Sequence, residues 1–171
     1  MTEEMIPIVN EKDEVIDEKP FNEVHKKGLL HRESYVYLIN SKKEVLLQKR
    51  PDRNVWDHSA AGHFSKDETY EEGALREFEE ELGISIKKED LKEIGYERFS
   101  SIRPGNHNER FAKIYFVKKD IPLTQFNIDE WELSDVKYFG KKELLALLKN
   151  QDLVAHSASI VMEKYILKLL N

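Results

Sequence analysis

Carboxylates are concentrated in one short stretch of the chain. The segment GHFSKDETYEEGALREFEEELGI, residues 62–84 and hereafter the acidic segment, holds eight acidic residues among 23 positions. Within it, Glu77, Glu80 and Glu81 are spaced i, i+3 and i+4, so on a helix their side chains are neighbours. Like charges at this spacing destabilise an isolated helix by about a few tenths of a kcal/mol per pair. The pattern therefore calls for a partner that offsets the repulsion.

Two interpretations of these carboxylates are open at this point. A run of charged residues is usually a solvated helix surface. Neighbouring carboxylates are also a site for Mg²⁺, which takes oxygen ligands, keeps several waters and is often shared with substrate phosphates. Arg76, four residues before Glu80, is placed to hold that carboxylate. Gly73, on the same helix face, would let another group approach the backbone.

The acidic segment is expected to be mostly helical. Residues 69–82 place Leu75, Phe78 and Leu82 on one apolar face, and Gly83 is suited to the C-terminal cap. Around it, alternating patterns predict strands and helices in mixed order, which favours an α/β sandwich with a mixed β-sheet between helices. The expected strands are residues 34–40, 44–48, 93–100, 110–117 and 136–139, and the further helices are 141–149 and 157–170. Residues 6–10 are a short apolar run, and residues 56–62 are expected to be short and extended. Residues 101–109 are expected to be a loop, and the whole chain, 1–171, one domain.

Composition narrows the class of protein. The formal net charge is −6, so a nucleic-acid partner is not expected, and a negative substrate would need bound cations. The chain has no cysteine, which excludes disulfides, thiolate metal sites and a cysteine nucleophile. No apolar run reaches the length of a membrane span, and the acidic N-terminal stretch is not typical of a signal peptide. No membrane association is expected, and the cytoplasm is the default location.

The acidic segment resembles the signature of the Nudix hydrolases. The matching positions are Gly62, Glu68, Arg76, Glu77, Phe78, Glu80, Glu81, Gly83 and Ile84. The resemblance implies an α/β/α sandwich in which this segment is a loop–helix–loop unit. It also implies Mg²⁺- or Mn²⁺-dependent hydrolysis of a nucleoside diphosphate linked to another group, or of a related diphosphate. The expected partner is thus a small-molecule diphosphate.

The resemblance also implies roles for individual residues. Glu77, Glu80 and Glu81 would be metal ligands, with Glu77 and Glu80 also catalytic, and Gly62 would offer backbone contacts at the metal site. Arg76 would orient the glutamates and face the substrate. Further along the chain, Glu109 would add a metal ligand or base, and Glu132 would be a general base. Arg50 is our candidate for a substrate phosphate, because arginine binds phosphate in a bidentate manner.

Three further stretches, FNEVHKKGLLHRESYVYLIN, WDHSAAGHFS and HNERFAKIYF, resemble type I isopentenyl diphosphate isomerase. By that likeness, His25, His31 and His63 would form a second metal site. The isomerase, however, needs a cysteine immediately before the Gly-His pair, and this chain has Ala61 there. The departure favours hydrolysis over isomerisation. A non-catalytic nucleotide-binding module is the other alternative, and because many relatives are dimers, a homodimer is an open possibility.

Overall fold

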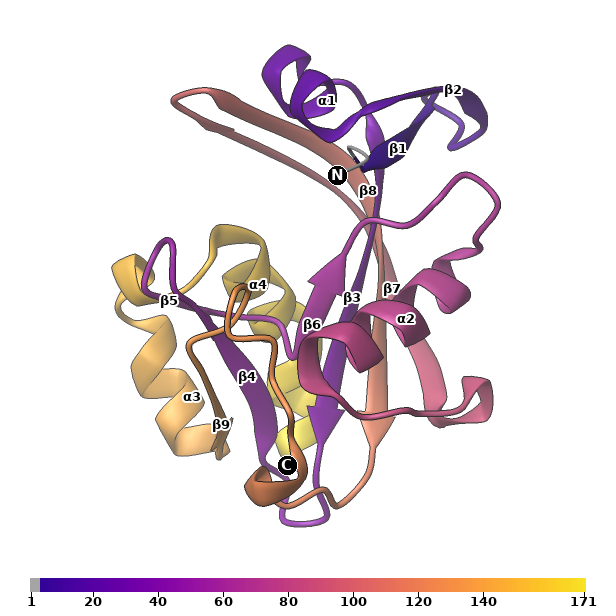
Figure 1. Ribbon diagram of the computed structural model, residues 1–171. Helices are drawn as coiled ribbons and strands as arrows, with labels where there is room; N and C mark the ends of the chain where they lie inside the picture. The colour runs from indigo at the N-terminus through magenta and orange to yellow at the C-terminus, as the bar shows by residue number, and fades with distance from the viewer. Residues whose placement is uncertain (1–3) are drawn as a thin grey trace.

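The computed structural model describes residues 4–171 and contains one mixed β-sheet with helices on both faces (Figure 1). Residues 1–3, the start of the acidic N-terminal stretch and of the expected domain, lie outside the described residues. The strands are β1 (Met5–Val9), β2 (Val15–Pro20), β3 (His31–Ile39), β4 (Val45–Arg50), β5 (Val55–Asp57), β6 (Ala60–Gly62), β7 (Leu91–Arg103), β8 (Asn106–Lys118) and β9 (Asp135–Phe139). The α-helices are α1 (Phe21–Lys27), α2 (Tyr70–Leu82), α3 (Lys141–Leu148) and α4 (His156–Val161).

Strand β3 is the centre of the sheet. It pairs antiparallel with β1, β4 and β6 and parallel with β8, while β9 and β5 lie beyond β4. Its residues from Tyr35 to Ile39 are buried without alternation, as expected for a strand covered on both faces. The mixed sheet expected from the sequence is confirmed.

The two faces of the sheet are covered by different helices. Helix α2 buries Phe78 and Leu82 completely against Leu38 and Leu46 on one face. On the other face, α3 and the C-terminal helical segment enclose a second core that includes Val161 and Ile166. Within residues 4–171, every helix is too short or too polar to cross a lipid bilayer.

Helix α2 is delimited by local signals that the sequence displays. Thr69 is the N-cap and forms a capping box with Glu72, whose carboxylate accepts from the Thr69 backbone N–H at 2.8 Å. Gly83 ends the helix at φ +67°, the left-handed conformation that favours glycine. The expected helix is thus confirmed, with its ends set by the cap and the glycine.

Two parts of the prediction were wrong. Residues 101–109 are not a loop, because β7 and β8 continue as a paired ribbon that turns at Pro104 and Gly105. Since β8 meets β3 only from Arg110 onwards, residues 100–109 form a two-stranded hairpin arm, hereafter the arm (Figure 1). The predicted helix 157–170 is α-helical only to Val161, and then changes to a π-turn (Met162–Ile166) and a 3₁₀ turn (Leu167–Leu170). Strand β2 and helix α1 were not predicted.

Gly73 allows α2 to approach its neighbour, although the neighbour is Phe64 of the same acidic segment. A Cβ on Gly73 would lie 2.5 Å from the Phe64 Cβ, which is too close for real atoms. We predict that Gly73→Ala lowers the free energy of unfolding by about 1–3 kcal/mol despite alanine's better helix propensity, because the overlap must be relieved. Urea denaturation measures the change.

Glu79→Ala is the matched control for this prediction. Glu79 lies on the exposed face of α2, so its replacement is expected to change stability by less than about 0.5 kcal/mol. A Gly73→Ala protein as stable as wild type would contradict the packing described.

Candidate active site

A cavity of about 690 Å³ opens between α2, β6, β5 and the arm. Its lining includes Glu77, Glu80 and Glu132 at one part of the wall and Arg53, Arg103 and Arg110 at another. The volume is within the range of pockets that bind small molecules. The cavity therefore brings residues that are far apart in the sequence to one concave surface.

Glu77 is buried against the backbone of β6. A Cβ on Gly62 would lie 2.3 Å from the Glu77 carboxyl carbon, so any larger residue there would displace the Glu77 carboxylate from its present position. Burial raises the pKa of Glu77 to about 7, although Arg76 opposes the shift. The Glu77 carboxylate thus lies directly against the backbone of Gly62, and Arg76 compensates its charge only in part.

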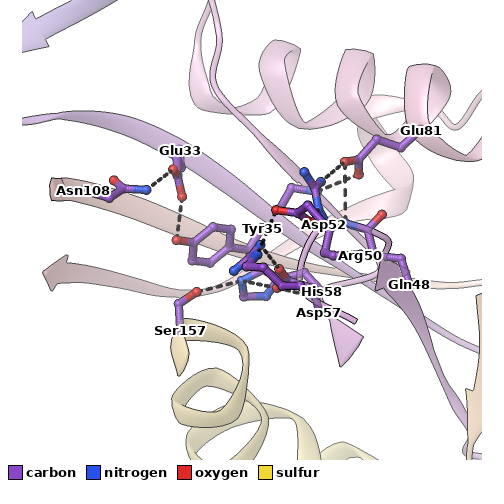
Figure 2. Close-up of polar contacts among 12 residues, drawn as sticks. Glu33, Tyr35, Gln48, Arg50, Asp52, Asp57, His58, Glu81, Asn108 and Ser157 are labelled. Atoms are coloured by element: carbon purple, nitrogen blue, oxygen red, sulfur yellow. Dashed lines mark hydrogen bonds and ion pairs between the residues drawn. The ribbon is translucent and has the colours of Figure 1, made fainter. Parts of the chain in front are cut away.

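Glu81 is also buried, with only 1 % of the residue exposed. The backbone N–H of Ala61 donates to its carboxylate at 3.0 Å, and Arg50 approaches it at 3.6 Å (Figure 2). Burial raises the pKa of Glu81 well above its usual range, because these two groups do not compensate for the lost water. Two of the three spaced carboxylates are therefore buried, and the solvated-surface interpretation of the acidic segment does not describe them.

Arg76 positions the carboxylates around it. Its Nε donates to Glu68 at 2.9 Å, and one terminal nitrogen donates to Glu77 at 3.0 Å and to Glu80 at 2.8 Å. The other terminal nitrogen donates to the His63 carbonyl at 2.9 Å and to Glu68 at 3.2 Å. All five N–H donors of the guanidinium are engaged, so Arg76 orients the glutamates and has no donor left for a substrate.

The structure brings some of the other expected residues to the cavity and leaves one outside. Glu132 lines it, held by a turn in which its N–H donates to the Asp129 carbonyl at 3.0 Å and buried Leu133 anchors the backbone. Arg50 lines it as well. Glu109 does not, because side chains alternate along β8 and its neighbours Asn108 and Arg110 face the cavity instead. The Glu109 carboxylate contacts Ser100 and His107.

His25, His31 and His63 meet at one place, as the resemblance implied. Their ring centroids lie 5.1 Å apart in all three pairs. Nδ1 of His25 lies 2.9 Å from the Phe21 carbonyl, and Nδ1 of His31 lies 2.8 Å from the Leu29 carbonyl. A ring that donates from Nδ1 keeps its Nε2 lone pair free for a metal ion. Strand β3, helix α1 and the acidic segment thus combine to aim three imidazoles at one point.

Glu33 completes this group and was missed by the sequence reasoning. Ligand atoms of His25, His31, Glu33 and His63 all lie within 4.8 Å of one another. Nε2 of His31 and of His63 is buried without a hydrogen-bond partner among residues 4–171, which is the state expected of metal-binding nitrogens. The available signal was the i, i+2 spacing of His31 and Glu33, which places both on one face of a strand.

The Glu33 carboxylate is held in its charged form. Arg110 contacts it at 2.7 Å. The Tyr35 hydroxyl donates to it at 2.7 Å, and Asn108 donates at 3.1 Å (Figure 2). Burial alone would raise the pKa of Glu33, but Arg110 and the histidines outweigh it and keep that pKa well below its usual range. We call the four residues His25, His31, Glu33 and His63 the histidine cluster.

A polar wall closes the cavity next to Arg110. The ring of Tyr35 stacks on that of His58 with centroids 3.8 Å apart, and the Tyr37 hydroxyl lies 2.5 Å from His58 Nδ1. His58 Nε2 lies 3.3 Å from the Ser157 hydroxyl of α4 (Figure 2). Burial lowers the pKa of His58 to about 4, so this imidazole is neutral at pH 7.

The buried neutral His58 predicts a pH dependence of stability. Its pKa rises from about 4 in the folded chain to about 6.5 when unfolded, so the unfolded chain binds more protons between these values. The stability that this residue contributes is complete above pH 6.5 and falls by about 3 kcal/mol as the pH drops to 4. We predict that His58→Asn, which keeps an acceptor for Tyr37, loses this component. Urea denaturation at pH 7 and pH 4.5 measures it, and equal pH slopes for the two proteins would refute the assignment.

Comparison with known proteins identifies the family. The model of the NUDIX domain matches residues 29–161. An uncharacterized Nudix hydrolase of Listeria monocytogenes is 34 % identical over 134 residues, which cover 75 % of each chain. Isopentenyl-diphosphate Delta-isomerase 2 of Photorhabdus laumondii is 29 % identical over 153 residues, 86 % of this chain and 84 % of that one.

A solved structure supports the fold independently. The crystal structure of DR0079 from Deinococcus radiodurans superimposes with a TM-score of 0.70 at 23 % identity, over 95 % of this chain and 99 % of that one. Together with the intact acidic segment, these matches confirm the expected fold and family. The chain belongs to the Nudix hydrolase family, in a branch related to isopentenyl-diphosphate isomerases.

Proposed function

We propose that this protein is a Mg²⁺- or Mn²⁺-dependent hydrolase that cleaves a nucleoside diphosphate linked to another group, or a related diphosphate. The observation that carries the proposal is the burial of Glu77 and Glu81 beside the cavity, with Glu80 next to them and 58 % of its side chain exposed. Buried carboxylates without full compensation favour a cation, because the alternative is protonation.

The donor set fits a hard divalent cation. Carboxylate oxygens of Glu77, Glu80 and Glu81 and the backbone at Gly62 are the oxygen ligands that such ions prefer. When bound, the ions would neutralise the diphosphate, polarise a phosphorus–oxygen bond and lower the pKa of the attacking water. Bound ions would replace the hydrogen bonds that Arg76 donates to Glu77 and Glu80. Arg76 would thus hold these two carboxylates in place in the absence of metal.

Other residues of this chain would orient the substrate and take the proton. Glu132 faces the same cavity from the turn after Asp129, a position suited to a general base. Arg50 lies between Asp52 and Glu81, with its Nε 3.7 Å from the former and a terminal nitrogen 3.6 Å from the latter. These contacts are long, so its guanidinium can turn to a substrate phosphate at little cost. We therefore retain both residues in the proposed site and leave Glu109 outside it.

The histidine cluster supports a second metal site of a different kind. Three imidazoles and one carboxylate suit a transition-metal ion such as Mn²⁺ or Zn²⁺ better than Mg²⁺. The two orphaned Nε2 atoms and the charged Glu33 carboxylate form a ready-made donor set. This site lies in the same cavity wall, since Glu33, His25 and His63 all line it.

Isomerisation of a diphosphate is the second candidate, favoured by the relative named as an isomerase and by the histidine cluster. Against it stands Ala61, whose methyl group cannot transfer a proton where the isomerase needs a cysteine. A panel of diphosphates that includes isopentenyl diphosphate separates the candidates, because an isomerase would form an allylic diphosphate with its diphosphate bond intact, whereas a hydrolase would cleave that bond. A purely binding module would turn over nothing with any metal.

The first prediction of this proposal concerns Glu80. Glu80→Gln is expected to lower Mg²⁺-dependent turnover at least about a hundredfold, because it removes a charged ligand while changing one atom. Formation of the cleaved products of the substrate panel, separated by chromatography, measures the loss. Glu79→Gln is the matched control: Glu79 is the neighbouring exposed carboxylate on α2, and turnover within twofold of wild type is expected. Equal loss in both variants, or in neither, would count against the proposal.

The second prediction concerns the histidine cluster. Mn²⁺ at about 100 times its dissociation constant is expected to stabilise the protein by about 2.7 kcal/mol through this site. Thermal unfolding in the Glu80→Gln background, with and without Mn²⁺, measures the shift. His31→Gln should abolish the histidine-dependent part, and His156→Gln, an exposed histidine on α4, should retain it. An undiminished shift in His31→Gln would exclude a metal at the cluster.

A further inference from the structure

The arginines that line the cavity differ in whether they pair with a carboxylate. Arg110 is paired with Glu33 at 2.7 Å, Arg53 with Asp52 at 3.3 Å and with Asp57 at 3.4 Å. Arg50 and Arg76 also face carboxylates. The side chain of Arg103 makes no hydrogen bond or ion pair within residues 4–171, although it lines the same cavity. It is therefore an exposed cation at the cavity that has no direct partner.

Neighbouring groups increase this excess of positive charge. Burial lowers the pKa of Arg103, and the positive charges of Arg53 and Arg110 lower it further, while Asp57 and Asp52 oppose them. Those two carboxylates are already engaged by Arg53. An anion beside Arg103 would consequently relieve repulsion among three guanidinium groups as well as gain a direct contact.

Two uncharged hydrogen-bond donors accompany Arg103 on the arm. Ser101 lies two residues before it on β7, and Asn106 is its direct partner on β8. Both line the cavity, and within residues 4–171 neither side chain has a hydrogen-bond partner. A hydroxyl, an amide and a free guanidinium on one face of a ribbon are the donors that phosphate groups use in proteins.

The position of the arm separates these donors from the acidic segment. In Figure 1 the free end of the arm projects on the side of the molecule away from α2. One cavity of about 690 Å³ nevertheless reaches both Arg103 and the Glu77–Glu80 wall. A single ligand can therefore present its diphosphate to the carboxylates and another group to the arm.

We propose that Ser101, Arg103 and Asn106 form an anion subsite that binds a second phosphate group of the substrate, remote from the diphosphate that is cleaved. The inference rests on the proposed hydrolytic function and narrows its substrate class to diphosphates that carry an additional phosphate. Arg103 supplies a bidentate charge-assisted contact, and the hydroxyl and amide supply neutral donors. The arm acts as a specificity-determining element.

The subsite is tested first without turnover. With EDTA present the acidic segment has no cation with which to hold a phosphate, so stabilisation by inorganic phosphate in thermal unfolding reports on the arm. Chloride at matched ionic strength corrects for screening. Wild type is expected to show a saturable shift, and Arg103→Gln is expected to require about ten times more phosphate for the same shift. Arg103→Lys keeps the positive charge but not the bidentate donor geometry of the guanidinium, so its phosphate requirement should fall between those of wild type and Arg103→Gln.

Arg98→Gln is the matched control, because Arg98 lies on the same strand, pairs with Glu11 and does not line the cavity. It should bind phosphate as wild type does. A wild-type protein that is not stabilised beyond the chloride control, or an Arg103→Gln protein indistinguishable from wild type, would overturn the subsite. Neither outcome depends on whether the protein hydrolyses anything.

The second part of the test measures turnover of the substrate that the panel identifies. Arg103→Gln is expected to raise its KM about tenfold with kcat within twofold, and removal of the remote phosphate from the substrate should have the same effect on wild type. An unchanged KM in Arg103→Gln would overturn the specificity role. Failure of the whole panel would count against the proposed hydrolytic function, and the phosphate-binding result would still decide whether the subsite exists.

Discussion

Removing a carboxylate from water costs several kcal/mol, and helix α2 buries two of them beneath the β6 backbone with only partial compensation from Arg76 and Arg50. Neighbouring groups offset part of this cost. Gly62 provides the space for Glu77, and the Ala61 N–H donates to Glu81. Arg76 donates to Glu68, Glu77 and Glu80 and to the His63 carbonyl. The capped, well-packed helix fixes the spacing. Such an arrangement stores negative charge at a cavity, which a divalent cation would neutralise.

The same cavity has three electrostatically distinct regions. The α2 carboxylates form an acidic region, the histidine cluster a region of three imidazoles and one carboxylate, and the arm with Arg53 and Arg110 a cationic one. Glu33 links the last two, since it contacts Arg110 at 2.7 Å while facing His63 at 3.3 Å. A polyanionic substrate with bound cations would complement this distribution of charge along its length.

Much of this arrangement can be predicted from local patterns. The spacing of Glu77, Glu80 and Glu81, the cap at Thr69 and the glycine at 83 are contained within one helix, so periodicity and motif suffice. The arm was missed because its polar residues hide a strand pattern, although the Pro104–Gly105 pair marks a turn. The C-terminal segment was predicted as one continuous α-helix, but it is α-helical only to Val161. Glu33 and Arg103 could not be assigned, because their partners come from strands that meet only in the folded sheet. Glu109 faces away from the cavity for a related reason, since strand alternation decides which side it takes.

The most direct test of the central claim is anomalous X-ray diffraction from crystals soaked in Mn²⁺. The account predicts an anomalous peak coordinated by carboxylate oxygens of Glu77, Glu80 and Glu81, with the Arg76 guanidinium displaced from at least one of them. A second peak within the histidine cluster is expected as well. Clear density for the protein with no anomalous peak at the α2 carboxylates would contradict the account, because their burial would then have no cation to explain it.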